Sequence, residues 1–326
     1  MKICIIKLGA KGDVVRTLPV LLGIKQKYPD SEITWITKQS SQEIVENSPH
    51  VHKIFTLPDE PVEKFNILYN FDIDEQATQL AEKIQADKKL GFYSQDGFAQ
   101  AFNFSAEYYL NTLFDDQLKK QNKKTYQQIM FETAELEYNK QHHPITLSEQ
   151  DEKFAQDFAN QNNINTEKLI GIHYGASPRW PSKKWHKDNL IEFIKKATEK
   201  NYEILLFGGP DEAQEHEQLF NNLIQKGIKI YRNNPQNSDK EFFSLVNLCT
   251  KIICGDTFAL HVALALKKPT TGLFFCTPSN EIEGYGLLKK ITSPELYNFF
   301  PEKCDQYDEE LTKSISAQEV LDSLEQ

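Results

Sequence analysis

The chain lacks any long uninterrupted apolar segment. A membrane-crossing helix needs about 20 mostly apolar residues, and no run near that length occurs among the 326 residues. The first residues also lack the positively charged start and the apolar run of a secretory signal. We therefore expect a cytoplasmic protein that does not span a membrane.

Cysteine and positive charge are both in short supply. The formal net charge is −10, and because a phosphate backbone is held mainly by clustered Lys and Arg, this charge argues against general nucleic-acid binding. The five cysteines form an odd number without C-x-x-C spacing. We expect them to be reduced, buried thiols: Cys4, Cys249, Cys254, Cys276 and Cys304.

What the chain does contain is a repeated alternation of strand and helix patterns, which is typical of βαβ crossovers and a parallel sheet. The length of 326 residues favours two domains over one core. A polar stretch near 145–167 divides the chain, so we predict domains over 1–150 and 151–326. The segment 316–325 is amphipathic and free to pack back on the first domain. Strands are predicted at 3–6, 32–38, 51–57, 65–71, 88–93, 169–175, 203–209, 228–232, 251–256 and 270–275.

Two local features of the first half carry further predictions. Ser40 and Glu43 have the spacing of a capping box that starts a helix. Residues 94–140 lose the strand pattern and become helical and aromatic. We interpret this region as a helical excursion packed on the sheet edge, with a dedicated ligand surface as the alternative.

The pattern of residues 1–19 predicts a buried strand, a tight loop and a helix. Gly9 and Gly12 allow the loop to turn sharply and bring bare backbone near a ligand. Asp13 follows them, at the carboxyl end of the first strand, where open α/β sheets place their active sites. The alternative is that Asp13 is only a helix N-cap. No Walker lysine-serine pair and no complete dinucleotide fingerprint is present.

Three loops of the second half also carry polar residues just after strands. Residues 173–185 combine small residues, including Ser177, with positive charge, including Lys183, and suit a phosphate or diphosphate. The alternative is a basic surface loop anchored by Trp180 and Trp185. In the loop 207–212, Glu212 is placed to bind ribose hydroxyls or to complement a helix dipole.

The loop 254–261 places Asp256 and Thr257 at another strand-to-helix corner, with His261 one turn along. A carboxylate, a hydroxyl and an imidazole gathered at one corner indicate a ligand site. An N-cap followed by a core histidine is the alternative.

Five stretches in the chain's order resemble the bacterial heptosyltransferase family, glycosyltransferase family 9. The resemblance spans about residues 1–290. It implies a GT-B fold, with two Rossmann-like domains facing across a cleft. It also implies an inverting, metal-independent transfer of a sugar, usually from ADP-heptose, to a lipopolysaccharide core acceptor. The stretches are GDVVRTLP (12–19), GAS with KKW (175–185), GGPDE (208–212), GDTFALHVALALKKPT (255–270) and EGYG (283–286).

The resemblance also implies residue roles. Asp13 matches the proposed general base, Lys183 the diphosphate-binding lysine and Glu212 the ribose-binding acid. Asp256, Thr257 and His261 match positions near the donor, and Ser177 would donate to phosphate. The expected partners are a nucleotide-sugar donor and a lipid-linked glycan acceptor that docks on the first domain, with a peripheral contact at the cytoplasmic face of the inner membrane and no cofactor.

The chain departs from the family pattern at three positions. Phe258 and Phe275 stand where the family usually has glycine, and His186 stands where proline is common. Glycine at the first two positions permits close backbone approach to the donor, so phenylalanine there fills space or reshapes the pocket.

The same sequence is also compatible with rival functions. Asp72 and Asp74 form a D-x-D, the metal-binding signature of the other major glycosyltransferase fold, although we interpret Asp74 as a helix cap. A nucleotide-sugar-binding pseudo-transferase would use Lys183 and Glu212 but not Asp13. A GT-B-like nucleotide-sugar epimerase would need no acceptor.

Overall fold

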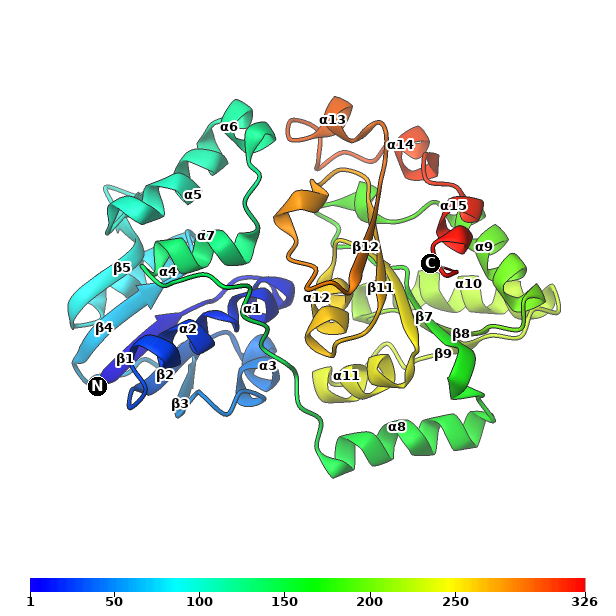
Figure 1. The fold of residues 1–326 in the computed structure, drawn as a ribbon, viewed down its shortest axis with the longest axis horizontal. Coiled ribbons are helices and arrows are strands. Elements are labelled where there is room, and N and C mark those ends of the chain that lie inside the picture. The colour runs from blue at the N-terminus through cyan, green and yellow to red at the C-terminus, as the bar shows by residue number, and fades with distance from the viewer. Residues whose placement is uncertain (326) are drawn as a thin grey trace. The chain divides into compact units, whose positions relative to one another are not determined.

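The computed structural model describes residues 1–325, and the chain divides into two compact units (Figure 1). Unit 1 comprises Met1–Ile145 together with Asn280–Glu283. Unit 2 comprises Thr146–Ser279 and the chain from Gly284 onward. Each unit has its own six-stranded sheet. The alternating patterns predicted two α/β halves, and the family resemblance implied two Rossmann-like domains; this fold class is confirmed.

The sheet of unit 1 has the strand order β3-β2-β1-β4-β5-β6. Its central strand β1 pairs in parallel with β2 on one side and with β4 on the other. Four of the five residues of β1 are buried, as expected of a strand covered on both faces. The strands are β1 (Lys2–Ile6), β2 (Glu32–Thr37), β3 (Lys53–Thr56), β4 (Phe65–Asn70), β5 (Ala86–Gln95) and β6 (Phe98–Ala101).

Strand β6 corrects the prediction that residues 94–140 contain no strand. It pairs antiparallel with β5, and the two are joined by Asp96 and Gly97, which have φ angles of 52° and 83°. Aspartate followed by glycine favours a two-residue hairpin turn, because both central residues need positive φ. The local signal was therefore present in the sequence.

The helices of unit 1 are α1 (Lys11–Thr17), α2 (Val20–Lys27), α3 (Gln42–Glu46), α4 (Glu75–Lys83), α5 (Phe104–Phe114), α6 (Asp116–Gln121) and α7 (Tyr126–Thr133). The predicted capping box at Ser40 is wrong. Helix α3 begins at Gln42 after a 3₁₀ turn, with Ser41 at its N-cap and no side-chain capping bond. The helix thus follows directly from the 3₁₀ turn Gln39–Ser41 and not from a capping box.

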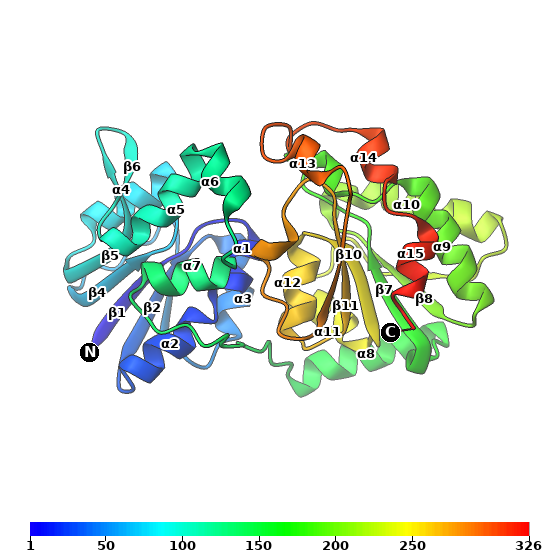
Figure 2. The same cartoon turned by 45° about the horizontal axis from the view of Figure 1, so that its top comes forward.

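The sheet of unit 2 is entirely parallel, in the order β12-β11-β10-β7-β8-β9. Figure 2 shows its strands from a second side. The chain moves outward from β7 through β8 and β9, then returns to β10 on the other side of β7. The strands are β7 (Leu169–His173), β8 (Glu203–Phe207), β9 (Tyr231–Arg232), β10 (Lys251–Gly255), β11 (Thr270–Phe274) and β12 (Leu288–Thr292).

The helices of unit 2 are α8 (Glu149–Asn162), α9 (Lys187–Glu199), α10 (Ala213–Gln225), α11 (Asp239–Leu248), α12 (Phe258–Ala265), α13 (Leu296–Phe299), α14 (Glu309–Lys313) and α15 (Ala317–Asp322). Helix α15 packs on α9 within unit 2, in place of the expected return to the first half. The side chain of Lys200 pairs with Glu325, and Lys251 donates to the carbonyl of Leu324. These contacts hold the end of the described chain on unit 2.

All five cysteines are buried, free thiols, as predicted. Burial raises the pKa of the Cys276 thiol to about 12, so that side chain stays protonated near neutral pH. Within residues 1–325, no helix combines the length and the apolar character that a membrane crossing requires.

Candidate functional site

Predicted site residues of unit 2 lie where the strand order of its sheet reverses, between β10 and β7. Strands β7 and β10 are neighbours, yet the chain leaves them in opposite directions across the sheet. Loops that follow two such strands diverge and leave room for a ligand at the carboxyl edge of the sheet. Lys183 lies in the loop after β7, and Asp256 directly follows β10.

The ion pair between Lys183 and Asp256 is the centre of this arrangement. The Lys183 ammonium lies 2.7 Å from Asp256 Oδ2 and donates to the Asp256 carbonyl at 3.0 Å. Thr277 donates to the same carboxylate oxygen at 2.8 Å. His261 Nε2 lies 3.9 Å from Asp256 Oδ1. Both side chains of the ion pair are about 15% exposed, so the pair is largely buried but not closed off from solvent.

The close approach of the loop to β10 depends on Gly255. A Cβ atom at this position would lie 2.5 Å from the backbone oxygen of Lys183. Carbon and oxygen atoms in non-bonded contact need more than 3 Å, so only glycine lets the Lys183 backbone lie here.

We therefore expect Gly255→Ala to lower the free energy of unfolding by roughly 1–3 kcal/mol, the usual cost of overpacking. Denaturant unfolding measures the change. Gly209→Ala is the matched control, because its Cβ would meet only the carboxylate end of Glu212, at 3.1 Å. Equal stability of Gly255→Ala and the wild type would show that the Lys183 loop moves freely.

Glu212 lies in a second part of the site, beside the loop after β7. Its Oε2 accepts a hydrogen bond from the Gly209 amide at 3.0 Å. A Cβ atom at Gly175 would lie 2.6 Å from Glu212 Oε1, so the absence of a side chain at Gly175 leaves room for the carboxylate. Glu212 thus closes a local turn, and it also presents an acidic group beside bare backbone.

Thr257 and Ser177 occupy other positions at the same edge. Thr257 is the N-cap residue of α12, without a side-chain capping bond, and its hydroxyl lies 3.5 Å from His173 Nδ1. Ser177 is exposed and accepts from the Arg179 amide at 3.3 Å. The structure thus brings Lys183, Asp256 and His261 together, while Ser177 stays in the outer loop.

His173 is a site residue that the sequence did not single out. It is the last residue of β7. Burial, with smaller effects from His216 and Lys184, lowers the pKa of His173 to about 4. The imidazole is therefore neutral near pH 7 and is available as a hydrogen-bond partner for Thr257.

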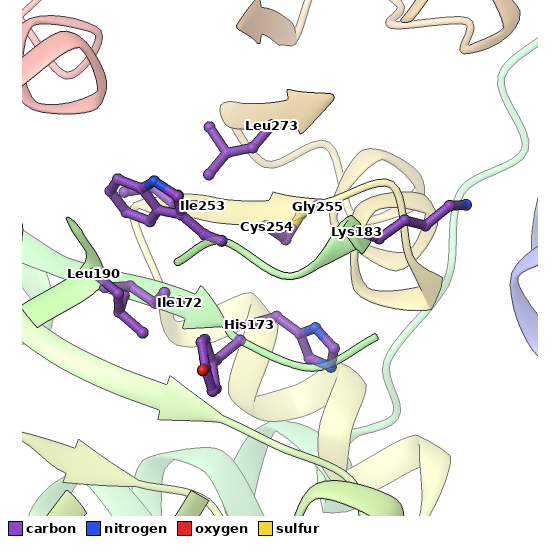
Figure 3. A pocket seen from close by; sticks show the side chains of 10 residues that line it. Ile172, His173, Lys183, Leu190, Ile253, Cys254, Gly255 and Leu273 are labelled. Carbon is purple, nitrogen blue, oxygen red and sulfur yellow. The ribbon is translucent and has the colours of Figure 1, made fainter. Parts of the chain in front are cut away.

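A small pocket lies at the ends of β7 and β10 (Figure 3). Figure 3 shows Ile172 and His173 on one strand and Ile253, Cys254 and Gly255 on its neighbour, with the Lys183 side chain extending away from the apolar residues. The pocket is therefore apolar toward the sheet and charged toward the loops. Its lining comprises Ile172, His173, Tyr174, Lys183, Trp185, Leu190, Ile253, Cys254, Gly255 and Leu273.

In unit 1, Asp13 lies in the first turn of α1, and the N-cap residue is Ala10. The alternative that Asp13 is an N-cap is therefore wrong. Its Oδ1 lies 2.7 Å from a guanidinium nitrogen of Arg16, and the Asp13 side chain is 35% exposed. Arg16 lies over the ring of Tyr126, 3.7 Å from the ring centre. The Asp13 carboxylate is thus held in place by Arg16 and remains accessible to solvent.

The D-x-D pair is divided between two different environments. Asp72 is buried against Lys7, whereas Asp74 is exposed at the N-cap position of α4 without a side-chain capping bond. The prediction that Asp74 is a helix cap is confirmed for its place at the N-cap of α4. Its side chain, however, makes no capping hydrogen bond. Asp72 is already engaged in an ion pair, which does not favour a metal-binding role.

Each of the three departures from the family pattern has a structural role. Phe258 stacks on Phe242 with ring centres 5.7 Å apart. Phe275 is 1% exposed and belongs to the core of unit 2. His186 is the N-cap residue of α9, and its Nδ1 accepts from the Asp188 amide at 3.3 Å, so it starts the helix.

Two Rossmann-like units, each with charged side chains where the strand order of its sheet reverses, have the arrangement of the GT-B fold. The chain matches the model of glycosyltransferase family 9 (heptosyltransferase) over residues 40–309. It belongs to this family and is a glycosyltransferase, as the sequence motifs predicted.

Similar proteins agree with this assignment. The chain is 27% identical over 303 residues to lipopolysaccharide heptosyltransferase 1 of Campylobacter coli, covering 86% of this chain and 85% of that protein. The glycosyltransferase family 9 structure from Veillonella parvula superposes with a TM-score of 0.78 at 17% identity, covering 99% and 96% of the two chains. The E. coli ADP-heptose lps heptosyltransferase II superposes with a TM-score of 0.70 at 15% identity, covering 100% and 98%. These two structures have the same fold.

Proposed function

We propose that this glycosyltransferase transfers heptose from ADP-heptose to a lipopolysaccharide core or related envelope glycan, with inversion at the anomeric carbon and without a metal ion. The observation that carries the proposal is the Lys183–Asp256 pair at the switch point of unit 2. It holds one cation at the position where a diphosphate would bind. The similarity to lipopolysaccharide heptosyltransferases supports the choice of sugar and acceptor.

Unit 2 supplies the donor residues in this proposal. Lys183 turns from Asp256 toward the diphosphate and neutralises the charge that develops as the leaving group departs. Glu212, whose carboxylate lies in the space beside Gly175, accepts hydrogen bonds from the ribose hydroxyls. Thr257 and the first amides of α12 donate to phosphate oxygens. Ser177 adds a further donor, and His261 stays beside Asp256 to hold that carboxylate in place.

Unit 1 supplies the base. Asp13 takes the proton of the acceptor hydroxyl as the hydroxyl oxygen forms a bond to the anomeric carbon. The bond between that carbon and the diphosphate oxygen breaks, and its electron pair leaves with ADP. A single displacement of this kind inverts the anomeric centre. Because the acceptor is a lipid-linked glycan, the enzyme would work at a membrane surface.

A thermal-shift titration tests the donor. A ligand at about 100 times its dissociation constant stabilises a protein by about 2.7 kcal/mol, so ADP should raise the melting temperature more than UDP, GDP or CMP. The titration and the transfer assay are run with EDTA, because Lys183 takes the place of a divalent cation. A clear preference for UDP or GDP, or a strict need for Mn²⁺, would contradict the proposal.

A further inference from the structure

The carboxylate of Asp13 lies beside a buried ion pair that the proposed reaction does not use. Lys7 follows β1 and Asp72 follows β4, so the pair spans the switch point of the unit 1 sheet. The Lys7 ammonium lies 2.5 Å from Asp72 Oδ1 and donates to the Phe71 carbonyl at 3.1 Å. The side chains are only 3% and 7% exposed. A buried pair of this kind is costly to desolvate and weak evidence for stability.

Asp72 also holds the loop that leads to Asp13. Its Oδ2 accepts hydrogen bonds from the backbone amides of Leu8 and Gly9, the latter at 2.9 Å. Leu8 and Gly9 lie between β1 and α1, the helix whose first turn carries Asp13. A carboxylate that accepts hydrogen bonds from two successive backbone amides fixes the position and the orientation of this loop.

Three charged groups converge above Gly9. A Cβ atom at Gly9 would lie 3.1 Å from Asp72 Oδ1, 3.4 Å from Asp13 Oδ2 and 3.4 Å from the Lys7 ammonium. The Asp13 carboxylate and the Lys7 ammonium therefore lie close to one another. Any movement of Lys7 or Asp72 changes the surroundings of Asp13 directly.

The other groups around this cluster come from three helices. Arg16 on α1 pairs with Asp13, and the Tyr126 hydroxyl of α7 lies 3.0 Å from Thr17 Oγ1. Tyr109 of α5 is partly buried. Burial alone would lower the pKa of Lys7, but the Asp72 carboxylate, with Tyr126, Asp13 and Tyr109, raises it well above its ordinary value. Lys7 is thus a permanent positive charge next to Asp13.

We propose that Lys7 and Asp72 are positioning residues for the reaction. Asp72 holds the Gly9 loop so that the Asp13 carboxylate points at the acceptor hydroxyl, and the Lys7 charge keeps that carboxylate ionised. This inference rests on the proposed role of Asp13 as the base.

Asp72→Asn tests the positioning. An amide cannot accept from Lys7, Leu8 and Gly9 together, because one of its two ends is a donor. The loop must shift, and a misplacement of about 1 Å lowers the rate by roughly 10–100-fold. We expect kcat to fall by this factor, with the ADP dissociation constant unchanged because unit 2 holds the donor. The matched control is Asp87→Asn, which removes the exposed pair of Asp87 with Lys64 in the same unit.

The pH profile tests the charge of Lys7 and distinguishes positioning from a purely structural role. Lys7→Met removes the positive charge that lies near Asp13. The acidic limb of kcat/KM should move upward by about one pH unit. Lys7→Arg keeps the charge and should keep the limb in place. This comparison also remains informative where Asp72→Asn folds poorly.

Asp13→Asn separates the two proposals. Full activity of Asp13→Asn would contradict the proposed function itself. Loss of activity in Asp13→Asn, with wild-type kcat in Asp72→Asn and an unmoved acidic limb in Lys7→Met, would contradict the positioning role alone.

Discussion

Replacing Asp13 with Asn should lower the turnover number by roughly 10²–10⁴, the usual contribution of a positioned base. The amide keeps the shape of the side chain but cannot take the proton from the acceptor hydroxyl. The ion pair with Arg16 is partly exposed, so its loss should cost less than about 1 kcal/mol. Transfer rate, melting temperature and donor dissociation constant are measured side by side for the variant and the wild type.

Asp116→Asn is the matched control for this experiment, because Asp116 is an exposed acid in the first turn of another helix of unit 1. It should leave all three quantities unchanged. Full transfer activity in Asp13→Asn would rule out Asp13 as the base. A large loss of melting temperature would instead assign Asp13 a structural role at the start of α1.

Replacing Lys183 with Ala should weaken binding of ADP by roughly 10–100-fold, the value of a hydrogen bond to a charged group. The change removes the cation and leaves the Asp256 carboxylate, 14% exposed, without its lysine. A negative charge then faces the diphosphate. Binding of AMP should weaken less, because AMP lacks the distal phosphate. Isothermal titration with both nucleotides measures the difference.

Lys184→Ala provides the control for Lys183, since the two lysines are neighbours in one loop. Lys184 pairs with Glu215 at 2.6 Å and not with Asp256. Its removal changes the net charge equally, so a purely electrostatic effect of the loop would appear in both variants. Equal losses for ADP and AMP in Lys183→Ala would show that Lys183 does not contact the distal phosphate.

The local pattern of apolar and polar residues predicted which helices and strands form better than it predicted where they begin and end. Buried strands such as β10 and buried helices such as α12 can be recognised as apolar runs, because a buried element needs apolar side chains at consecutive positions. The capping box at Ser40 failed because a 3₁₀ turn precedes α3. Strand β6 was missed although Asp96 and Gly97 mark its turn, because the aromatic residues that follow dominate the pattern.

The candidate site shows a similar division. Asp13, Lys183, Glu212 and Asp256 stand out in the sequence because each follows a strand, where a parallel sheet exposes its loops. Thr277, His173 and Lys7 did not stand out. Each is a single polar residue next to an apolar run, and its partner lies far away in the chain: Thr277 contacts Asp256, His173 contacts Thr257, and Lys7 contacts Asp72.

The sequence by itself determined the two α/β halves, the family and the strand-end loops that carry charged residues, because these depend on period, glycine placement and the order of motifs. Only the tertiary structure decided that Lys183 pairs with Asp256 and that Lys7 and Asp72 support the Asp13 loop. Those pairs arise at β7 with β10 and at β1 with β4, strands that are neighbours in the sheet but far apart in the chain. Which strands become neighbours follows from packing the whole sheet, and no local pattern of residues encodes it.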